Sequence, residues 1–191
     1  MNALRLVTPR LIVTLPDESF AERVAAFQRE NREHLAPWSP SRPADFFEAK
    51  GQAGRLALAR SEYEADRSLR AVMLLADLPE GPVIGECNLS NFVRGAFQAC
   101  HLGYSVDHRF EGLGLMTEAL RVVVDHAFGP LALHRVMANH MPENARSERL
   151  LARLGFEREG LAREYLFIDA AWRDHVLNSL RNPGHPGPEA T

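Results

Sequence analysis

The stretch Tyr104-Ser-Val-Asp-His-Arg-Phe-Glu-Gly-Leu-Gly-Leu-Met-Thr-Glu-Ala119 joins an expected strand to an expected helix through a turn with two glycines. The first turn of a helix leaves backbone N–H groups without partners, and together with the helix dipole they attract an anion. Gly112 and Gly114 remove side chains where a phosphate would approach the backbone. The segment could therefore hold a pyrophosphate, although a turn that only joins a strand to a helix can need the same glycines.

Two well-known phosphate motifs do not match this turn. A Walker loop is excluded because no Gly-Lys-Ser/Thr follows the glycines. A dinucleotide fingerprint is excluded because the glycine spacing differs and the preceding strands are expected to be antiparallel rather than part of a βαβ unit.

Hydrophobic patterning outward from the turn predicts mainly strands before it and alternating strands and helices after it. The polarity of the second helical region, residues 44–67, indicates a solvent-facing lid. The pattern predicts a mixed α/β fold with helices on the faces of one sheet. Strands are expected over 5–15, 71–76, 83–91, 98–106 and 133–141, with strand character over 165–180, and helices over 20–35, 44–67, 116–129 and in a short segment after Asn144.

Length and composition narrow the class of protein. A chain of 191 residues suits one domain, expected over residues 1–181, with a disordered Pro- and Gly-rich tail over 182–191. The net charge of −3 gives no basic field for non-specific nucleic-acid binding. No apolar run is long enough to span a bilayer and no signal peptide is recognisable, so we expect a cytoplasmic protein. The two cysteines and eight histidines lack metal-ligand spacing, so no metal is expected.

The glycine turn resembles motif A of the GNAT superfamily of N-acetyltransferases, Gln/Arg-x-x-Gly-x-Gly/Ala, which holds the pyrophosphate of coenzyme A. Two registers compete. Arg109-x-x-Gly112-x-Gly114 fits better by its letters. We prefer Glu111-x-x-Gly114-x-Met116, because it places the following Thr-Glu-Ala-Leu at the helix start common in the ribosomal-protein branch.

Further blocks resemble the RimJ-type ribosomal-protein-alanine N-acetyltransferases, and together they cover residues 5 to 180. They include an Asn-Arg…Pro-Trp signature, the central strands, the second coenzyme motif and the final strand. These blocks are Glu30–Trp38, Asn88–Gly95, Ala99–Ser105, His134–Asn139, Pro142–Ser147, Leu150–Phe156 and Trp172–Leu177.

The resemblance implies the GNAT fold, a mostly antiparallel mixed sheet of about seven strands with helices on both faces and a V-shaped splay between strands 4 and 5. It also implies acetyl-CoA as co-substrate, with the pantetheine arm bonded along strand 4. Asn144 would contact the coenzyme or only cap its helix, and Arg146 and Arg149 would meet phosphates or remain solvated. The implied coenzyme-binding residues are Tyr104, Ser105, Val106, Gly112, Leu113, Gly114, Leu115, Met116, Thr117 and Asn144.

The chemistry implied by the resemblance needs a base and an acid. Ser147 matches a serine that could protonate the leaving thiolate, and Glu164 could act as base through water. The strand position where some relatives carry a glutamate base is Asn139, which cannot take a proton. Glu86 and His101, on central strands, are weaker candidates.

Three functions remain open from the sequence. An α-amine, with a pKa of about 8, needs a weaker base than a lysine at about 10.4. A terminal amine can therefore manage with a weak base or a water chain. The resemblance implies a protein N-terminus as acceptor, the N-terminal alanine of the fifth small-subunit ribosomal protein. The alternatives are a small amine acceptor, such as a polyamine, amino acid or drug, and a non-catalytic acyl-CoA-binding module.

Overall fold

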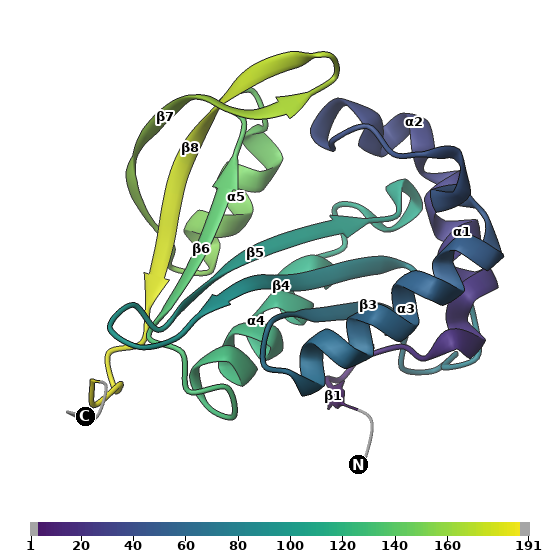
Figure 1. Cartoon of the computed structure of the whole chain (residues 1–191), viewed down its shortest axis with the longest axis horizontal. Helices are drawn as coiled ribbons and strands as arrows, with labels where there is room; N and C mark the ends of the chain where they lie inside the picture. The colour runs from purple at the N-terminus through teal and green to yellow at the C-terminus, as the bar shows by residue number, and fades with distance from the viewer. Residues whose placement is uncertain (1–3, 188–191) are drawn as a thin grey trace.

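The computed structural model describes residues 4–187 and contains one open sheet of eight strands (Figure 1). The strand order is β1-β2-β3-β4-β5-β6-β8-β7, and neighbouring strands are antiparallel except for β5 and β6. The sheet is thus mixed and mostly antiparallel, as predicted. The strands are Arg5–Val7 (β1), Leu11–Thr14 (β2), Leu69–Leu75 (β3), Gly85–Val93 (β4), Ala99–Val106 (β5), Arg135–His140 (β6), Glu157–Ile168 (β7) and Ala171–Arg181 (β8).

The first predicted strand is in fact a hairpin. β1 and β2 pair antiparallel, with Val7 opposite Ile12, and the chain reverses between them at residues 8–10. The strand character expected over 165–180 also belongs to a hairpin, β7 and β8, so the six predicted strand regions become eight strands, against the seven or so implied by the resemblance. The predicted strands 4 and 5 correspond to β5 and β6.

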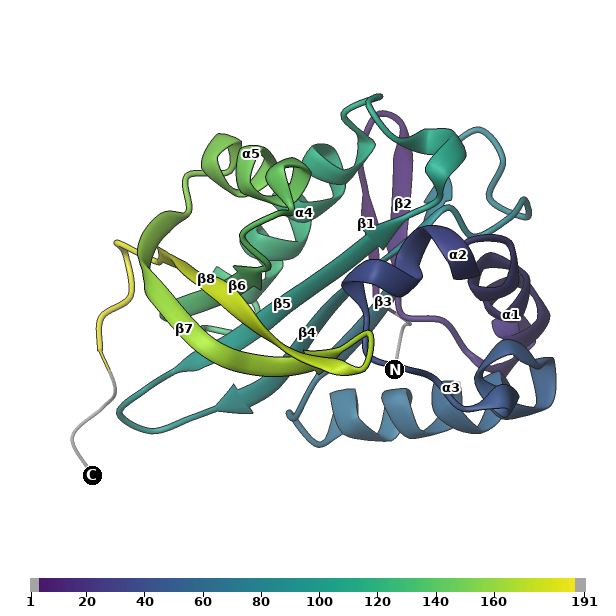
Figure 2. The same ribbon diagram turned by 90° about the horizontal axis from the view of Figure 1, so that it is seen from above.

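Helices cover both faces of the sheet (Figure 2). One face carries α1 and α3, and the other carries α4 and α5. α3 buries Gln52, Leu56 and Ala59, so it packs as a layer of the fold and the predicted lid is wrong. The helices are Ala21–Glu30 (α1), Arg32–Leu35 (α2), Ala49–Glu64 (α3), Leu115–Phe128 (α4) and Ala145–Arg153 (α5), with 3-10 turns at Glu18–Phe20, Ala36–Trp38, Ala44–Phe47 and His108–Phe110.

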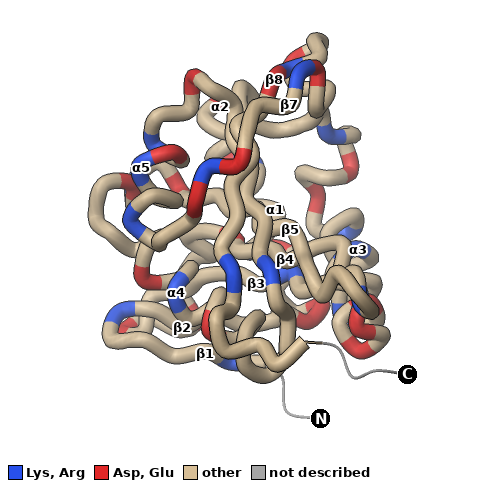
Figure 3. The backbone as a smooth tube through the Cα atoms, turned by 90° about the vertical axis from the view of Figure 1, so that its left-hand side faces the viewer, with Lys and Arg blue, Asp and Glu red and all other residues tan. Residues whose placement is uncertain are grey.

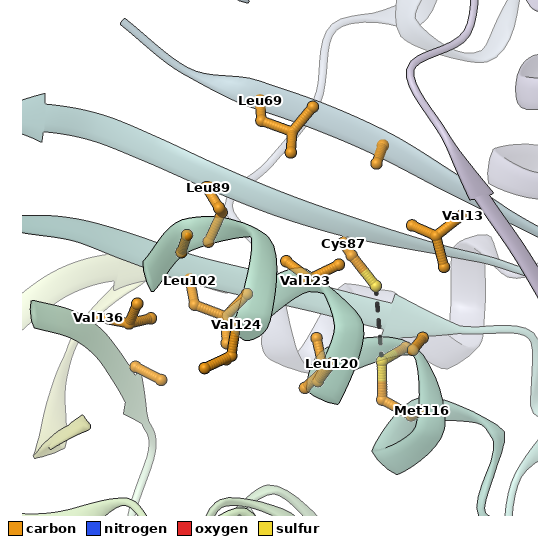
Figure 4. Packing of buried hydrophobic residues seen from close by; sticks show 14 of the residues in the cluster. Val13, Leu69, Cys87, Leu89, Leu102, Met116, Leu120, Val123, Val124 and Val136 are labelled. Atoms are coloured by element: carbon orange, nitrogen blue, oxygen red, sulfur yellow. Dashed lines mark hydrogen bonds between the residues drawn. The ribbon is translucent and has the colours of Figure 1, made fainter. Parts of the chain in front are cut away.

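The larger core lies between α4 and the sheet (Figure 4). Leu120 and Val123, fully buried on α4, recur at helical spacing and face strand residues such as Leu89. Burying a side chain of this size stabilises the fold by roughly 1.5–3 kcal/mol. This packing fixes the start of α4, and with it the glycine turn, against the sheet.

β5 and β6 separate after a short parallel pairing. Their register runs from Ala99 opposite Arg135 to His101 opposite Met137 and then stops, although both strands continue. Figure 1 shows the two strands diverging beyond that point. Residues 102–106 therefore have no neighbouring strand on the β6 side, which is the predicted splay.

The segment after β8 is fixed to the rest of the domain by a backbone hydrogen bond. Residues 182–187 follow β8, and the amide N–H of Asn182 donates to His134 O at 2.8 Å; the rest of the expected tail lies outside the described residues.

Acidic and basic positions intermingle along β7, β8 and α5 (Figure 3). None of the helices described is both long and apolar enough to cross a membrane.

Candidate active site

The glycine turn presents a row of backbone amides. Gly112 and Gly114 both adopt φ of +75°, a left-handed conformation that glycine adopts without steric cost. Gly114 is the N-cap of α4 and has no capping side chain. The amide of Glu118 makes the first helical bond, to Gly114 O, and within residues 4–187 the amides of 112–117 donate to no acceptor. This is the geometry of an anion site at a helix N-terminus.

The start of α5 places a second polar group beside β5. Asn144 is the N-cap of α5, and its Oδ1 accepts a hydrogen bond from the Ser147 amide at 3.0 Å. The side-chain NH2 of Asn144 makes no hydrogen bond to any described residue. The Ser147 hydroxyl in turn lies 2.5 Å from the Tyr104 hydroxyl on the splayed part of β5. The splay therefore has a hydroxyl pair between its β5 side and α5.

Burial keeps this hydroxyl pair protonated. It raises the pKa of Tyr104 to about 12, although the hydrogen bond with Ser147 opposes the rise. At neutral pH Tyr104 is therefore a neutral phenol that can donate a proton or pass one through Ser147.

The residues that begin the two motif registers are both held by ion pairs. Arg109 binds Asp107 and Glu30, with Nη2 2.6 Å from Glu30 Oε2, so its guanidinium ties the turn to α1. Glu111 Oε1 lies 3.2 Å from His34 Nε2, and Glu111 also forms an ion pair with Arg146 of α5. Arg149 is exposed.

A cavity of about 430 Å³ lies on the side of β5 opposite to α5 and the hydroxyl pair. Its walls come from α1, α2, the segment 36–47 and the tip of the β7–β8 hairpin, where Asp169 lies. β5 contributes Gly103, Tyr104 and Ser105, all beyond the last pairing with β6. The cavity therefore meets the splay along the same three residues.

Glu86 of β4 is the carboxylate of the central sheet that lines this cavity. Gln28 of α1 donates its Nε2 to Glu86 Oε2 at 2.9 Å. Burial raises the pKa of Glu86, while the hydrogen bond from Gln28 and the charges of Arg42 and Arg70 oppose the rise. A carboxylate whose pKa is raised toward neutrality is suited to accept a proton from an amine.

The candidates Glu164 and His101 lie elsewhere, as does Asn139, which stands where some relatives carry a glutamate base. Glu164 is exposed on a bulge of β7 with φ of +49°, and its amide donates to Asp174. Asn139 bonds Tyr165 through Nδ2 at 3.1 Å, tying β6 to β7. His101 ends the β5–β6 pairing, and burial lowers its pKa. None of the three lines the cavity as described.

Sequence reasoning named Glu86, Tyr104 and Ser105, which line the cavity, but missed its other walls. Gln28, Arg42 and Asp169 reach one space from three distant segments, and no local spacing marks them. The Pro-Trp signature was the one available signal, because Trp38 lies in the cavity wall.

Comparison with known proteins settles the family. Residues 10–157 match the acetyltransferase (GNAT) domain. The chain belongs to the GNAT acetyltransferase family. GNAT enzymes use acetyl-CoA as acetyl donor, and the unpaired amides at the turn and the open edge of β5 fit that coenzyme.

The similarity to individual GNAT proteins extends over nearly the whole chain. The chain is 44% identical to the ribosomal protein uS5-alanine N-acetyltransferase of Escherichia coli, covering 94% of this chain and 92% of that protein. The ribosomal-protein-S5-alanine acetyltransferase of Vibrio fischeri superposes with a TM-score of 0.91 at 37% identity, over 95% of this chain and 98% of that one. RimJ of Mycobacterium smegmatis, solved in complex with CoA-disulfide, superposes with a TM-score of 0.86 at 30% identity, over 96% of this chain and 88% of that one.

Proposed function

We propose that this protein transfers the acetyl group of acetyl-CoA to the N-terminal alanine of ribosomal protein uS5. The similarity to the E. coli and V. fischeri enzymes over nearly their full lengths supports this acceptor. The observation that carries the proposal is the cavity containing Glu86, which opens onto the splayed residues 103–105 of β5. An amine bound in the cavity and an acyl group bound in the splay would meet at residues 103–105 of β5, which border both spaces.

The coenzyme would occupy the splay and the glycine turn. The amides of Gly112 to Thr117 are suited to the pyrophosphate, and the free edge of β5 at Tyr104 to Val106 is suited to the amide groups of pantetheine. The helix starts at Leu115, directly after Gly114, which supports the register beginning at Glu111. Asn144 can offer its NH2 to the coenzyme while its Oδ1 caps α5.

Glu86 is the proposed base. Acetyl-CoA supplies an acyl group activated as a thioester. The carboxylate of Glu86, directly or through one water, takes a proton from the substrate ammonium and leaves a neutral amine to attack the carbonyl carbon. An α-amine needs only about 1.4 kcal/mol for deprotonation at pH 7, so a single carboxylate suffices.

Tyr104 and Ser147 are the proposed acid. As the C–S bond breaks, the sulfur gains the bonding electron pair, and the hydroxyl pair provides the proton that converts the thiolate to a thiol. Because burial keeps Tyr104 protonated, the donor is present throughout the physiological pH range. The attacking nitrogen passes its second proton to the hydroxyl pair, which restores the pair, and Glu86 releases the first proton to solvent. The N-terminal amide and free CoA thiol are then the products.

Intact-mass measurement tests the function. Purified protein, acetyl-CoA and unmodified uS5 should give a gain of one acetyl group on the N-terminal alanine, located by peptide fragmentation. The same incubation with uS5 whose N-terminus is already blocked should give none. Thiol release with polyamines or amino acids but not with uS5 would replace the protein acceptor with a small amine. Binding of acetyl-CoA without thiol release on any acceptor would indicate a non-catalytic module.

A further inference from the structure

The turn of the β1–β2 hairpin contacts the glycine turn from a point far away in the sequence. Arg10, at the end of the hairpin turn, donates Nη1 to the carbonyl oxygen of Leu113 at 3.0 Å. Leu113 lies between the two glycines with positive φ. The guanidinium also packs beside Gly114, where an added Cβ would lie 3.7 Å from Nη2.

Glu118, in the first turn of α4, holds Arg10 in place. Its Oε2 accepts from Arg10 Nε at 2.7 Å and lies 2.6 Å from Nη2. Its Oε1 accepts from the Arg10 amide at 3.0 Å and from the Thr8 hydroxyl at 2.6 Å. Burial raises the pKa of Glu118, but these hydrogen bonds more than offset it and the net shift is downward. The carboxylate is therefore charged and fully engaged at neutral pH.

The bond to Leu113 O fixes the direction of the next amide. In a trans peptide the C=O and the following N–H point in opposite directions within one plane. Holding the Leu113 carbonyl toward Arg10 therefore turns the Gly114 N–H away from Arg10. Without this bond the plane could rotate about the φ of Gly114, which glycine permits over a wide range.

We propose that Thr8, Arg10 and Glu118 are positioning residues that hold the glycine turn in its coenzyme-binding conformation before the coenzyme arrives. Arg10 acts through the Leu113 peptide, because one N–H on each of its three guanidinium nitrogens is held by Glu118 or by Leu113 O. A preorganised turn saves the entropic cost of ordering it during binding. The inference concerns coenzyme binding alone and does not depend on which amine is acetylated.

Glu118→Gln gives the sharpest test. Glu118 can affect CoA binding through its charge or by positioning Arg10, and these two explanations predict changes of opposite sign in the affinity for CoA. Replacing a carboxylate near a pyrophosphate site by an amide should tighten CoA binding if only charge matters. If Glu118 positions Arg10, the same change should weaken binding, and we expect the Kd for CoA to rise about fivefold to tenfold by calorimetry. KM for acetyl-CoA should rise by a similar factor while kcat changes by less than about twofold.

Thr8→Val and Arg10→Lys extend the test if the first variant does not fold. Both should also raise the Kd for CoA, because Val removes one bond to Glu118 and Lys cannot bond Leu113 and Glu118 in the same forked geometry. Arg181→Ala is the matched control, since it removes an ion pair, with Glu157, from an arginine as exposed as Arg10 and far from the turn. An unchanged or lower Kd in the folded variants, or an equal rise in Arg181→Ala, would overturn the proposal.

Discussion

Glu86 is the residue on which the proposed chemistry depends most. Glu86→Gln keeps the shape of the side chain and removes the proton acceptor, so kcat/KM for the acceptor should fall roughly 10- to 100-fold at pH 7. The loss should be smaller at pH 9, because an α-amine with a pKa of about 8 is then neutral without help. A pH profile of both proteins measures this. A larger loss of kcat/KM in Glu164→Gln than in Glu86→Gln would indicate that Glu164 on β7, and not Glu86, is the base.

The same substitution should affect stability in the opposite direction. Burial raises the pKa of Glu86 in the folded state, so its ionised form costs stability once the pH exceeds the value in the unfolded chain. At pH 7 Glu86→Gln should therefore unfold at a higher denaturant concentration than the wild type. Below the ordinary pKa of a glutamate the difference should shrink, because both side chains are then neutral.

The hydroxyl pair of Tyr104 and Ser147 makes a separate prediction. Ser147→Ala should lower kcat about tenfold or more while the Kd for CoA changes little, because the acid acts on the departing sulfur and not on the nucleotide. Tyr104→Phe in the same background should add little, since the two hydroxyls lie 2.5 Å apart and act as one unit. Equal turnover in Ser147→Ala and wild type, measured by thiol release, would remove the pair from the mechanism.

At the scale of elements, the β5–turn–α4 unit was predictable because it is local. Its alternation, two glycines and helical stripe all lie between Ala99 and Phe128, and strand, turn and helix start where expected. The β1–β2 hairpin was not predictable, because apolar residues flank Thr8-Pro9-Arg10 on both sides and read as one strand. α3 was mistaken for a lid because its buried face includes Gln52, whose Nε2 bonds Phe46 O.

The α4 start supplies a prediction at the same scale. Gly114→Asp places a carboxylate and a strained left-handed residue at the helix N-terminus, and the Kd for CoA should rise at least about a hundredfold because like charges repel. Gly95→Asp is the matched control. Gly95 has φ of +68° with nothing within 4 Å of an added Cβ, so it shares the strain but lies in the β4–β5 turn. Equal CoA affinity in Gly114→Asp and Gly95→Asp would contradict the assignment of the turn.

At the scale of the whole molecule, the acceptor cavity could not be read from the sequence. Its walls come from α1, β4, β5 and the β7–β8 tip, which only the folded sheet brings together. The splay was predictable only through family resemblance, because the end of the β5–β6 pairing leaves no mark in either strand. Local sequence thus predicted the glycine turn as the coenzyme site, while the tertiary structure was needed to favour Glu86 over the other candidate bases.

The β7–β8 hairpin gives the last prediction, which depends on a protein acceptor. Asp169 at its tip lines the cavity, and Phe167 and Trp172 beside it pair edge to face while remaining 52% and 60% exposed. Exposed aromatics next to a substrate cavity are suited to bind the chain that follows the acetylated residue.

Phe167→Ala combined with Trp172→Ala should therefore raise KM about tenfold for a ten-residue acceptor peptide, since burying such aromatics is worth more than about 1.4 kcal/mol. KM for a three-residue peptide should be unchanged, because a short peptide ends inside the cavity. Phe97→Ala, an aromatic of similar exposure in the β4–β5 turn, should alter neither value. Equal effects on both peptides would show that the hairpin only shapes the cavity, and acetylation of neither peptide by the wild type would count against the protein acceptor itself.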